Sequence, residues 1–128
     1  MVDQSQTSAP RRRNQELGRY GEDVATRYLV AQGLAILERN WRCSLGELDI
    51  VAREGDALVV CEVKTRTSRA YGTPAEAVTV SKRSRLRRLA VRWVQEHDVH
   101  PAEIRIDVLA VLRPASGPAH VEHLRGVV

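Results

Sequence analysis

Two runs of strand-forming residues between positions 46 and 67 are separated by a short glycine-containing segment at residues 54–56. This pattern predicts an antiparallel β-hairpin. Side chains of a strand alternate between its two faces, so a two-residue turn places Asp49 directly opposite Glu62. Residues paired in this way lie on the same face, with their Cβ atoms roughly 5 Å apart. Two carboxylates at that distance repel each other unless a cation neutralises them or one of them takes a proton.

The same register sets Glu47 opposite Lys64, so a lysine lies two residues after Glu62 and on the same face. Hard divalent cations such as Mg²⁺ bind oxygen ligands, and one or two carboxylates with water and substrate phosphate can hold one. Such an ion lowers the pKa of bound water and neutralises charge that develops at phosphorus. A neighbouring lysine can position the water or stabilise that charge. The hairpin therefore predicts a divalent-metal site that can cleave phosphodiester bonds.

Positive charge is concentrated in one part of the chain. The net charge of +4 understates a stretch from residue 64 to residue 92 that holds nine Lys or Arg residues against one acid, Glu76. A local block of this kind is typical of a protein that binds a polyanion, although a solvated helix face gives the same pattern. The residues that we expect to contact nucleic acid are Arg66, Lys82, Arg83, Arg85, Arg88 and Arg92.

Apolar residues recur at steps of three and four between residues 14 and 32, which predicts an amphipathic helix capped by Asn14. Gly18 and Gly21 each cost about 1 kcal/mol inside a helix relative to alanine, so we expect close backbone approach to a neighbouring element at both. Glu22 lies at the margin of the apolar stripe. From there it could reach along the packed face toward the acidic end of the sheet, or it could be solvated.

A second helix is predicted over residues 78–96, with a capping-box signal upstream at Thr73 and Glu76 and an interruption or restart near residues 79–81. Lys82 lies one turn before Leu86, in line with the apolar stripe, so its side chain is expected to aim inward; alternatively, its stem covers apolar surface and its head stays in water. The opposite side of the helix carries Arg85, Arg88 and Arg92.

The remaining strands complete the predicted sheet. Residues 34–42 read as a first strand with Ile36 and Leu37 entering the core. Residues 104–112 are apolar on both faces, which is typical of a central strand, and Asp107 within them is interpreted as a hydrogen-bonded structural carboxylate. With a short edge strand after residue 120, the order α-β-β-β-α-β predicts a three-layer α/β/α sandwich around a central mixed sheet.

Chain length and composition limit the kinds of protein that this chain can be. We expect a disordered basic tail over residues 1–13 and a single domain over residues 14–128. No apolar run approaches the roughly 20 residues that span a bilayer, and the N-terminus does not resemble a signal peptide. Cys43 and Cys61 show no metal or redox spacing, and the histidines do not form a zinc motif. These observations favour a cytoplasmic protein with free thiols and no membrane partner.

Asp49 followed on the next strand by Glu62-Val63-Lys64 resembles the PD-(D/E)xK motif of restriction-endonuclease-like nucleases. A wider set of segments resembles the bacterial YraN-like family, over about residues 17–112. They are Gly18-Arg19-Tyr20-Gly21-Glu22, Asn40-Trp41-Arg42, Gly46-Glu47-Leu48-Asp49 and Glu62-Val63-Lys64-Thr65-Arg66. That family is poorly characterised, is regarded as nuclease-like and is related in fold to archaeal Holliday junction resolvases.

The resemblance implies a metal-dependent nuclease fold with Asp49 and Glu62 as metal ligands, Lys64 as a catalytic residue and Glu22 as a further, helix-borne ligand. The chain departs from the full superfamily motif at Leu48, which stands where the motif has proline before the first acid. The superfamily tolerates this change.

Three functions are compatible with these features. The leading hypothesis is a Mg²⁺- or Mn²⁺-dependent endonuclease that acts on branched or otherwise structured DNA, and a symmetric junction as substrate would require a homodimer. The second is a nucleic-acid-binding module on the same fold that does not cleave. The third is a structural or partner-binding domain in which Asp49, Glu62 and Lys64 form a salt bridge.

Overall fold

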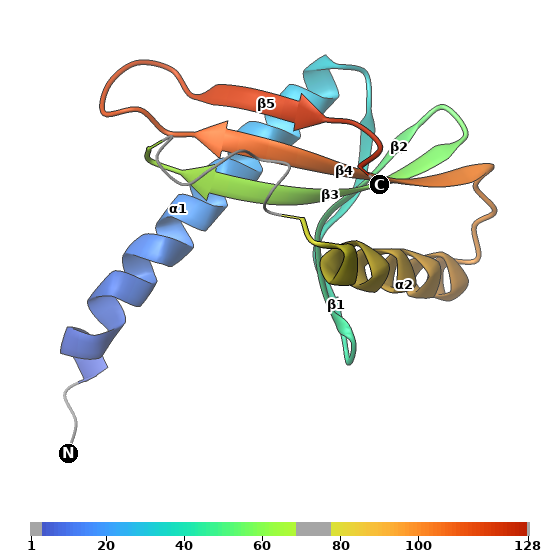
Figure 1. Cartoon of the computed structure of the whole chain (residues 1–128), viewed down its shortest axis with the longest axis horizontal. Helices are drawn as coiled ribbons and strands as arrows, with labels where there is room; N and C mark the ends of the chain where they lie inside the picture. Colours follow the sequence, from blue (N-terminus) through green and yellow to red (C-terminus); the bar gives the residue numbers. More distant parts are fainter. Residues whose placement is uncertain (1–3, 69–77, 128) are drawn as a thin grey trace.

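The computed structural model describes residues 4–68 and 78–127, with side chains described from residue 13 onward. The elements are α1 (Gln4–Ala31), β1 (Ala35–Cys43), β2 (Gly46–Glu54), β3 (Ala57–Arg66), α2 (Val80–His97), β4 (Glu103–Leu112) and β5 (His120–Leu124). The five strands form one sheet in their sequence order (Figure 1). Neighbouring strands are antiparallel except β3 and β4, which are parallel. The sheet is therefore mixed, as predicted.

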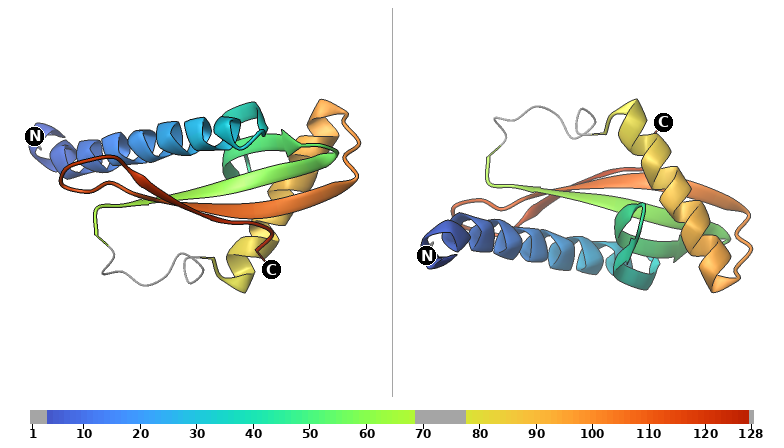
Figure 2. Two further views of the ribbon diagram at one scale, coloured as in Figure 1. Left: turned by 90° about the horizontal axis from the view of Figure 1, so that it is seen from above. Right: turned by 90° about the horizontal axis from the view of Figure 1, so that it is seen from below.

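The two helices cover opposite faces of this sheet (Figure 2). The α1 side has a core built around Ala25, Leu29, Ile50, Val59 and Leu109. The α2 side has a core built around Trp41, Leu48, Val60, Leu89 and Trp93. The predicted three-layer sandwich is confirmed, and Glu103–Leu112 is a central strand buried on both faces.

The β2–β3 hairpin has the predicted register, but its backbone ladder ends early. Pairing runs from Glu54↔Ala57 to Ile50↔Cys61. Asp49 and Glu62 come next in this register, yet there the side chain of Asp49, and not its backbone, accepts a hydrogen bond from Val63 N at 2.9 Å. The first residues of β2 pair only with β1. The strands β2 and β3 therefore part at the two carboxylates.

The side-chain alternation of β2 breaks at the same level. Leu48 packs in the α2-side core and Ile50 in the α1-side core, although strict alternation would put both on one face. In the paired strand, Asn40 adopts a left-handed conformation with φ 54°. The strands β1 and β2 therefore change direction together beside Asp49. The end of the β1–β2 hairpin that carries its turn bends toward α2.

The long first helix differs from its sequence prediction. It begins at Gln4 rather than at Asn14, so the segment predicted to be a disordered tail is helical from that point. Its N-terminal end extends past the edge of the sheet (Figure 1). The Gln, Ala and Arg residues of this segment have high helix propensity, but Ser, Thr and Pro10 do not, so propensity alone does not account for the extension. Neither helix in the described part of the chain is long and apolar enough to cross a membrane.

Two further local predictions are corrected. Leu37 was expected in the core but is 43% exposed, because the β1–β2 register shifts between Ile36 and Glu38 and leaves Leu37 outside the ladder. The cap of α2 is Thr79, whose side chain accepts a hydrogen bond from Lys82 N at 3.1 Å. The predicted capping box at residues 73–76 lies outside the described residues.

The predicted close approach of α1 to the sheet is confirmed at one glycine. A Cβ atom on Gly21 would collide with the Thr65 side chain of β3, and its nearest atom would be Thr65 Oγ1. A Cβ atom on Gly18 would meet no atom within 4 Å, so the expectation for Gly18 is wrong. Gly21 therefore lets α1 lie directly against β3, three residues after Glu62.

The two glycines make a matched pair for testing this contact. Gly21→Ala should lower the free energy of unfolding by about 1–3 kcal/mol, because the methyl group overpacks against Thr65. Gly18→Ala should raise it by about 0.4–1 kcal/mol, because alanine loses less backbone entropy on folding. Urea unfolding of both variants measures the difference, and equal effects would contradict the close contact.

Candidate functional site

The parting of β2 and β3 opens a cleft of about 400 Å³ between the sheet and the start of α2. Its lining combines the acids of the hairpin with the basic first turns of α2. The lining residues are Gly46, Glu47, Asp49, Glu62, Lys82, Arg85 and Leu86. The structure thus gathers at one place several residues that lie far apart in the sequence.

Glu62 is buried on β3, with 9% of its surface exposed. Two ammonium groups share its Oε1 atom: Lys64 Nζ lies at 3.3 Å and Lys82 Nζ at 2.7 Å. Lys64 comes from the same strand, whereas Lys82 reaches across from the first turn of α2. The prediction that Lys82 aims inward is confirmed, and its ammonium group is bound to a carboxylate rather than left in water.

Asp49 is fixed by the fork in the sheet, because its Oδ2 atom accepts the hydrogen bond from Val63 N at 2.9 Å. Burial and the nearby charge of Glu62 raise the pKa of Asp49 to about 7, against the lowering effect of the Val63 hydrogen bond. Asp49 therefore keeps its proton to a higher pH than an ordinary aspartate does. Its charged form is thus disfavoured both by burial and by its acidic neighbours.

The two lysines respond in opposite ways to this environment. Burial, followed by the neighbouring Lys82, lowers the pKa of Lys64. Burial also disfavours the charged form of Lys82, but its contact with the Glu62 carboxylate outweighs burial and raises the pKa of Lys82. The charge of Glu62 is thus matched chiefly by Lys82, and Lys64 is the lysine that gives up its proton more readily.

Glu22 lies on α1 close enough for its charge to contribute to the raised pKa of Asp49. Its carboxylate is engaged at 3.7 Å by Arg39 Nη2, which also donates a hydrogen bond to Asp23 at 2.8 Å. Among the residues that the structure describes, no three His, Cys, Asp or Glu side chains are grouped so that they could hold a metal ion by themselves. Asp49 and Glu62 therefore form a pair, with Glu22 nearby.

The six predicted nucleic-acid-binding residues are spread over α2 and the end of β3. Lys82 and Arg85 line the cleft, so Arg85 lies on the same side of α2 as Lys82 and the expectation that it lies on the opposite side is wrong. Arg88 borders a shallow depression on the outer side of α2, together with Arg87. Arg92 donates a hydrogen bond from Nε to Glu96 at 3.1 Å. Arg83 is half-buried in the first turns of α2, and Arg66 is half-buried at the end of β3.

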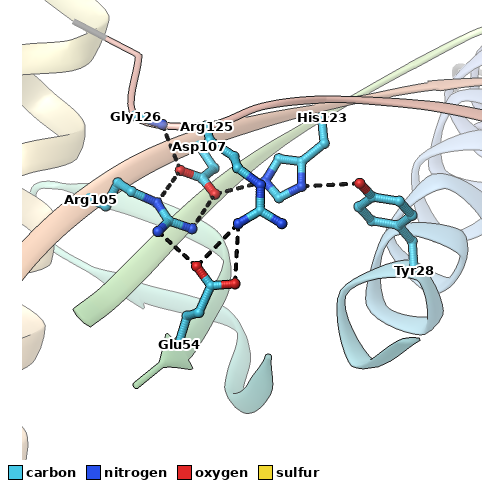
Figure 3. Close-up of polar contacts among 7 residues, drawn as sticks. All are labelled: Tyr28, Glu54, Arg105, Asp107, His123, Arg125 and Gly126. Carbon is cyan, nitrogen blue, oxygen red and sulfur yellow. Dashed lines mark hydrogen bonds and ion pairs between the residues drawn. The ribbon is translucent and has the colours of Figure 1, made fainter. Parts of the chain in front are cut away.

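A second polar cluster surrounds Asp107 on β4, and its members come from α1, β2, β4, β5 and the segment after β5 (Figure 3). Arg105 donates from Nε and Nη2 to the two carboxylate oxygens at 2.9 and 3.0 Å. Gly126 N donates to Oδ1 at 2.9 Å, and His123 Nε2 lies 2.7 Å from Oδ2. The other ring nitrogen of His123 lies 3.3 Å from the hydroxyl oxygen of Tyr28.

This cluster is closed to solvent, because the side chain of Asp107 is 0% exposed and that of His123 is 4% exposed. Burial opposes ionisation of Asp107, but Arg105, Gly126 N and His123 outweigh it and lower its pKa. The interpretation of Asp107 as a structural carboxylate is confirmed. No sequence motif singled out His123; the only signal was Arg105 and Asp107 at alternate positions of one strand, which places both on the same face.

The chain matches the model of an uncharacterised protein family, UPF0102, over residues 21–111. A UPF0102 protein of Beutenbergia cavernae is 64% identical over 111 residues, which cover 87% of this chain and 94% of the relative. One from a Nocardioides species is 59% identical over 113 residues, covering 88% and 91%. One from Streptomyces coelicolor is 57% identical over 113 residues, covering 87% of each. The matched range includes Glu22, Asp49, Glu62 and Lys64.

The raised pKa of Asp49 makes a prediction about stability in the absence of divalent metal. Because the folded protein binds the Asp49 proton more tightly than the unfolded chain does, the free energy of unfolding should fall as the pH rises from about 4 to about 7. Asp49→Asn removes this term and still offers an oxygen to Val63 N. The variant and the wild type should be similarly stable at pH 4, and the variant more stable at pH 8 by up to about 4 kcal/mol.

Urea unfolding of both proteins across this pH range, with chelator present, measures the effect. Asp107→Asn is the control with the opposite sign: the pKa of Asp107 is lowered, so its contribution to stability is present above pH 4 and is lost as the pH falls through its folded pKa. Parallel stability curves for wild type and Asp49→Asn would contradict the electrostatic account of the cleft.

Proposed function

The chain belongs to the uncharacterised protein family UPF0102, and we propose that it is a metal-dependent endonuclease that hydrolyses phosphodiester bonds in structured or branched DNA. The membership confirms the resemblance to the YraN-like family. The observation that carries the proposal is the carboxylate pair of Asp49, which is half-buried, and Glu62, which is buried, at the point where β2 and β3 separate. The pair opens into a cleft whose other wall is basic.

The residues of the cleft fit a hard divalent cation. Asp49 and Glu62 present carboxylate oxygens, which are the ligands that Mg²⁺ and Mn²⁺ prefer. The raised pKa of Asp49 supports the fit, because burial and the charge of Glu62 disfavour its negative charge and a bound cation would stabilise it. Two carboxylates are sufficient when water and substrate phosphate supply the remaining ligands. Glu22 on α1, whose charge already raises the pKa of Asp49, would be a further metal ligand.

A bound ion would supply a nucleophilic water at neutral pH and neutralise charge on the scissile phosphate. The side chains of the protein provide the other requirements. Val63 N holds Asp49 in one orientation, so the carboxylate is preorganised. Lys64 is one-third exposed at the side of Glu62, and burial lowers its pKa, so it can hold or transfer a proton beside the attacked phosphate.

Nucleic acid would enter the cleft from the side of α2. Lys82 and Arg85 lie at the cleft itself, and Arg88 extends the basic surface along the outer side of the helix. Contacts of this kind with backbone phosphates bind without reading sequence, and their strength falls with rising salt. This fits a substrate that is recognised by its structure, and a symmetric junction would require two copies of the chain.

The second candidate is a nucleic-acid-binding module that does not cleave. The observation that favours it is the pair of ammonium groups on Glu62 Oε1, which can be read as a complete ion-pair cluster. In this reading the acids stabilise the fold, and the basic side of α2 binds phosphate without chemistry.

A cleavage assay on four-way junction DNA and on linear duplex, with Mg²⁺ or Mn²⁺, tests the proposal. Asp49→Asn and Glu62→Gln should each lower the rate by about 10³-fold or more, because each removes a metal ligand. Lys64→Met should lower kcat by about 10²–10⁴-fold with DNA affinity nearly unchanged. Glu103→Gln, at the exposed start of β4, is the control and should cut as the wild type does.

Binding measured in parallel separates the two candidates. If wild type and Glu62→Gln bind junction DNA equally and neither cuts, the protein is a binding module. If neither binds DNA in a salt-dependent way, both candidates are wrong.

A further inference from the structure

We propose that Lys82 is an internal counter-ion of Glu62 in the metal-free protein, and that a divalent cation displaces its ammonium group onto a phosphate of the bound nucleic acid. This inference rests on the proposed function and gives Lys82 a role beyond that of a surface phosphate contact. It makes the binding of metal and the binding of nucleic acid depend on each other.

The contact between Lys82 and Glu62 joins two layers of the sandwich. Lys82 Nζ lies 2.7 Å from Glu62 Oε1, and the side chains are 21% and 11% exposed. The other ammonium group on this oxygen, Lys64 Nζ, is more distant at 3.3 Å and its side chain is more exposed, at 33%. Lys82 is therefore the cation that most directly covers the carboxylate that a metal ion would need.

The charges of the cleft explain why metal and Lys82 compete. A divalent cation on Glu62 and Asp49 would lie beside two ammonium groups and the guanidinium of Arg85, so the cleft would carry excess positive charge. The repulsion falls if Lys82 withdraws or if an anionic phosphate enters. Metal affinity should thus be weak in the free protein and stronger with nucleic acid bound, and the coupling must be reciprocal.

Lys82 can move without disturbing the fold. Its backbone N–H is held by the Thr79 cap, so the helix start stays fixed while the flexible four-carbon stem changes rotamer. Arg85 lies one turn further on the same side of α2 and lines the same cleft. A released Lys82 ammonium would therefore stand beside Arg85, where two cations can share an incoming phosphate.

Calorimetric titration of Mn²⁺ into the full chain without nucleic acid tests the competition. Lys82→Met should bind Mn²⁺ about tenfold more tightly than the wild type, because the competing cation is gone. Arg85→Met is the matched control: it removes one positive charge from the same cleft without removing a group from Glu62, and it should change the affinity by less than about threefold. Lys82→Gln provides a second variant should the methionine variant fold poorly.

A second titration uses the same proteins saturated with a junction DNA whose linkages resist cleavage. Wild-type Mn²⁺ affinity should rise by about tenfold or more when DNA is bound, and Lys82→Met should lose most of that increase. Asp49→Asn in the Lys82→Met background should abolish Mn²⁺ binding, which places the ion at the acid pair.

The outcomes separate this inference from the proposed function. Equal effects of Lys82→Met and Arg85→Met, in a protein whose cleavage depends on Asp49, would overturn the role of Lys82 and leave the nuclease proposal standing. A selective gain in Lys82→Met without any cleavage would support the counter-ion and overturn the nuclease. Absence of Mn²⁺ binding in every protein, with and without DNA, would overturn both.

Discussion

The parting of β2 from β3 after the Ile50–Cys61 pair is the constraint on which the candidate site depends. In a continuous ladder the next hydrogen-bonded pair would be Leu48 with Val63, and the two strands would leave no space between them. Instead the side chain of Asp49 takes the Val63 amide, and the free portion of β2 follows β1 toward α2. The acids are thereby held rigidly at the wall of a cleft rather than on a loop.

Two aspartates of the sheet contrast in a way that bears on function: Asp107 is fully buried, whereas Asp49 is half-buried at the cleft. Asp107 is satisfied by Arg105, His123 and the Gly126 amide, and its pKa is lowered. Asp49 has one amide partner and acidic neighbours, and its pKa is raised. Buried charges in proteins are normally paired. Asp49, whose charged form is disfavoured, lines the open cleft, where an external cation can reach it. Asp107 is instead bound to His123 of β5 and to the Gly126 amide.

The sequence predicted the layers, the strand order and the hairpin register well, because alternation and helical periodicity report which faces are buried. It failed where the backbone departs from regular geometry: the bulge that exposes Leu37 and the left-handed Asn40 carry no periodic signal. The pairing of Asp49 with Glu62 was predictable, because the two-residue turn of the β2–β3 hairpin sets the register of its strands. The contact of Lys82 with Glu62 was predictable only as an inward direction, because its partner depends on how two layers pack. No motif pointed to His123 itself, because its partner Asp107 lies on another strand.

The central claim is that the Asp49–Glu62 pair binds a divalent cation, and paramagnetic Mn²⁺ in an amide NMR titration tests it most directly. Two amide signals of the same protein can be compared. The Val63 amide donates a hydrogen bond to Asp49, and the Gly126 amide donates one to Asp107. With junction DNA that resists cleavage present, substoichiometric Mn²⁺ should broaden the Val63 signal first and leave Gly126 sharp, and Asp49→Asn should remove the effect. Uniform broadening, or broadening centred away from Val63, would contradict a metal site at the parting of β2 and β3.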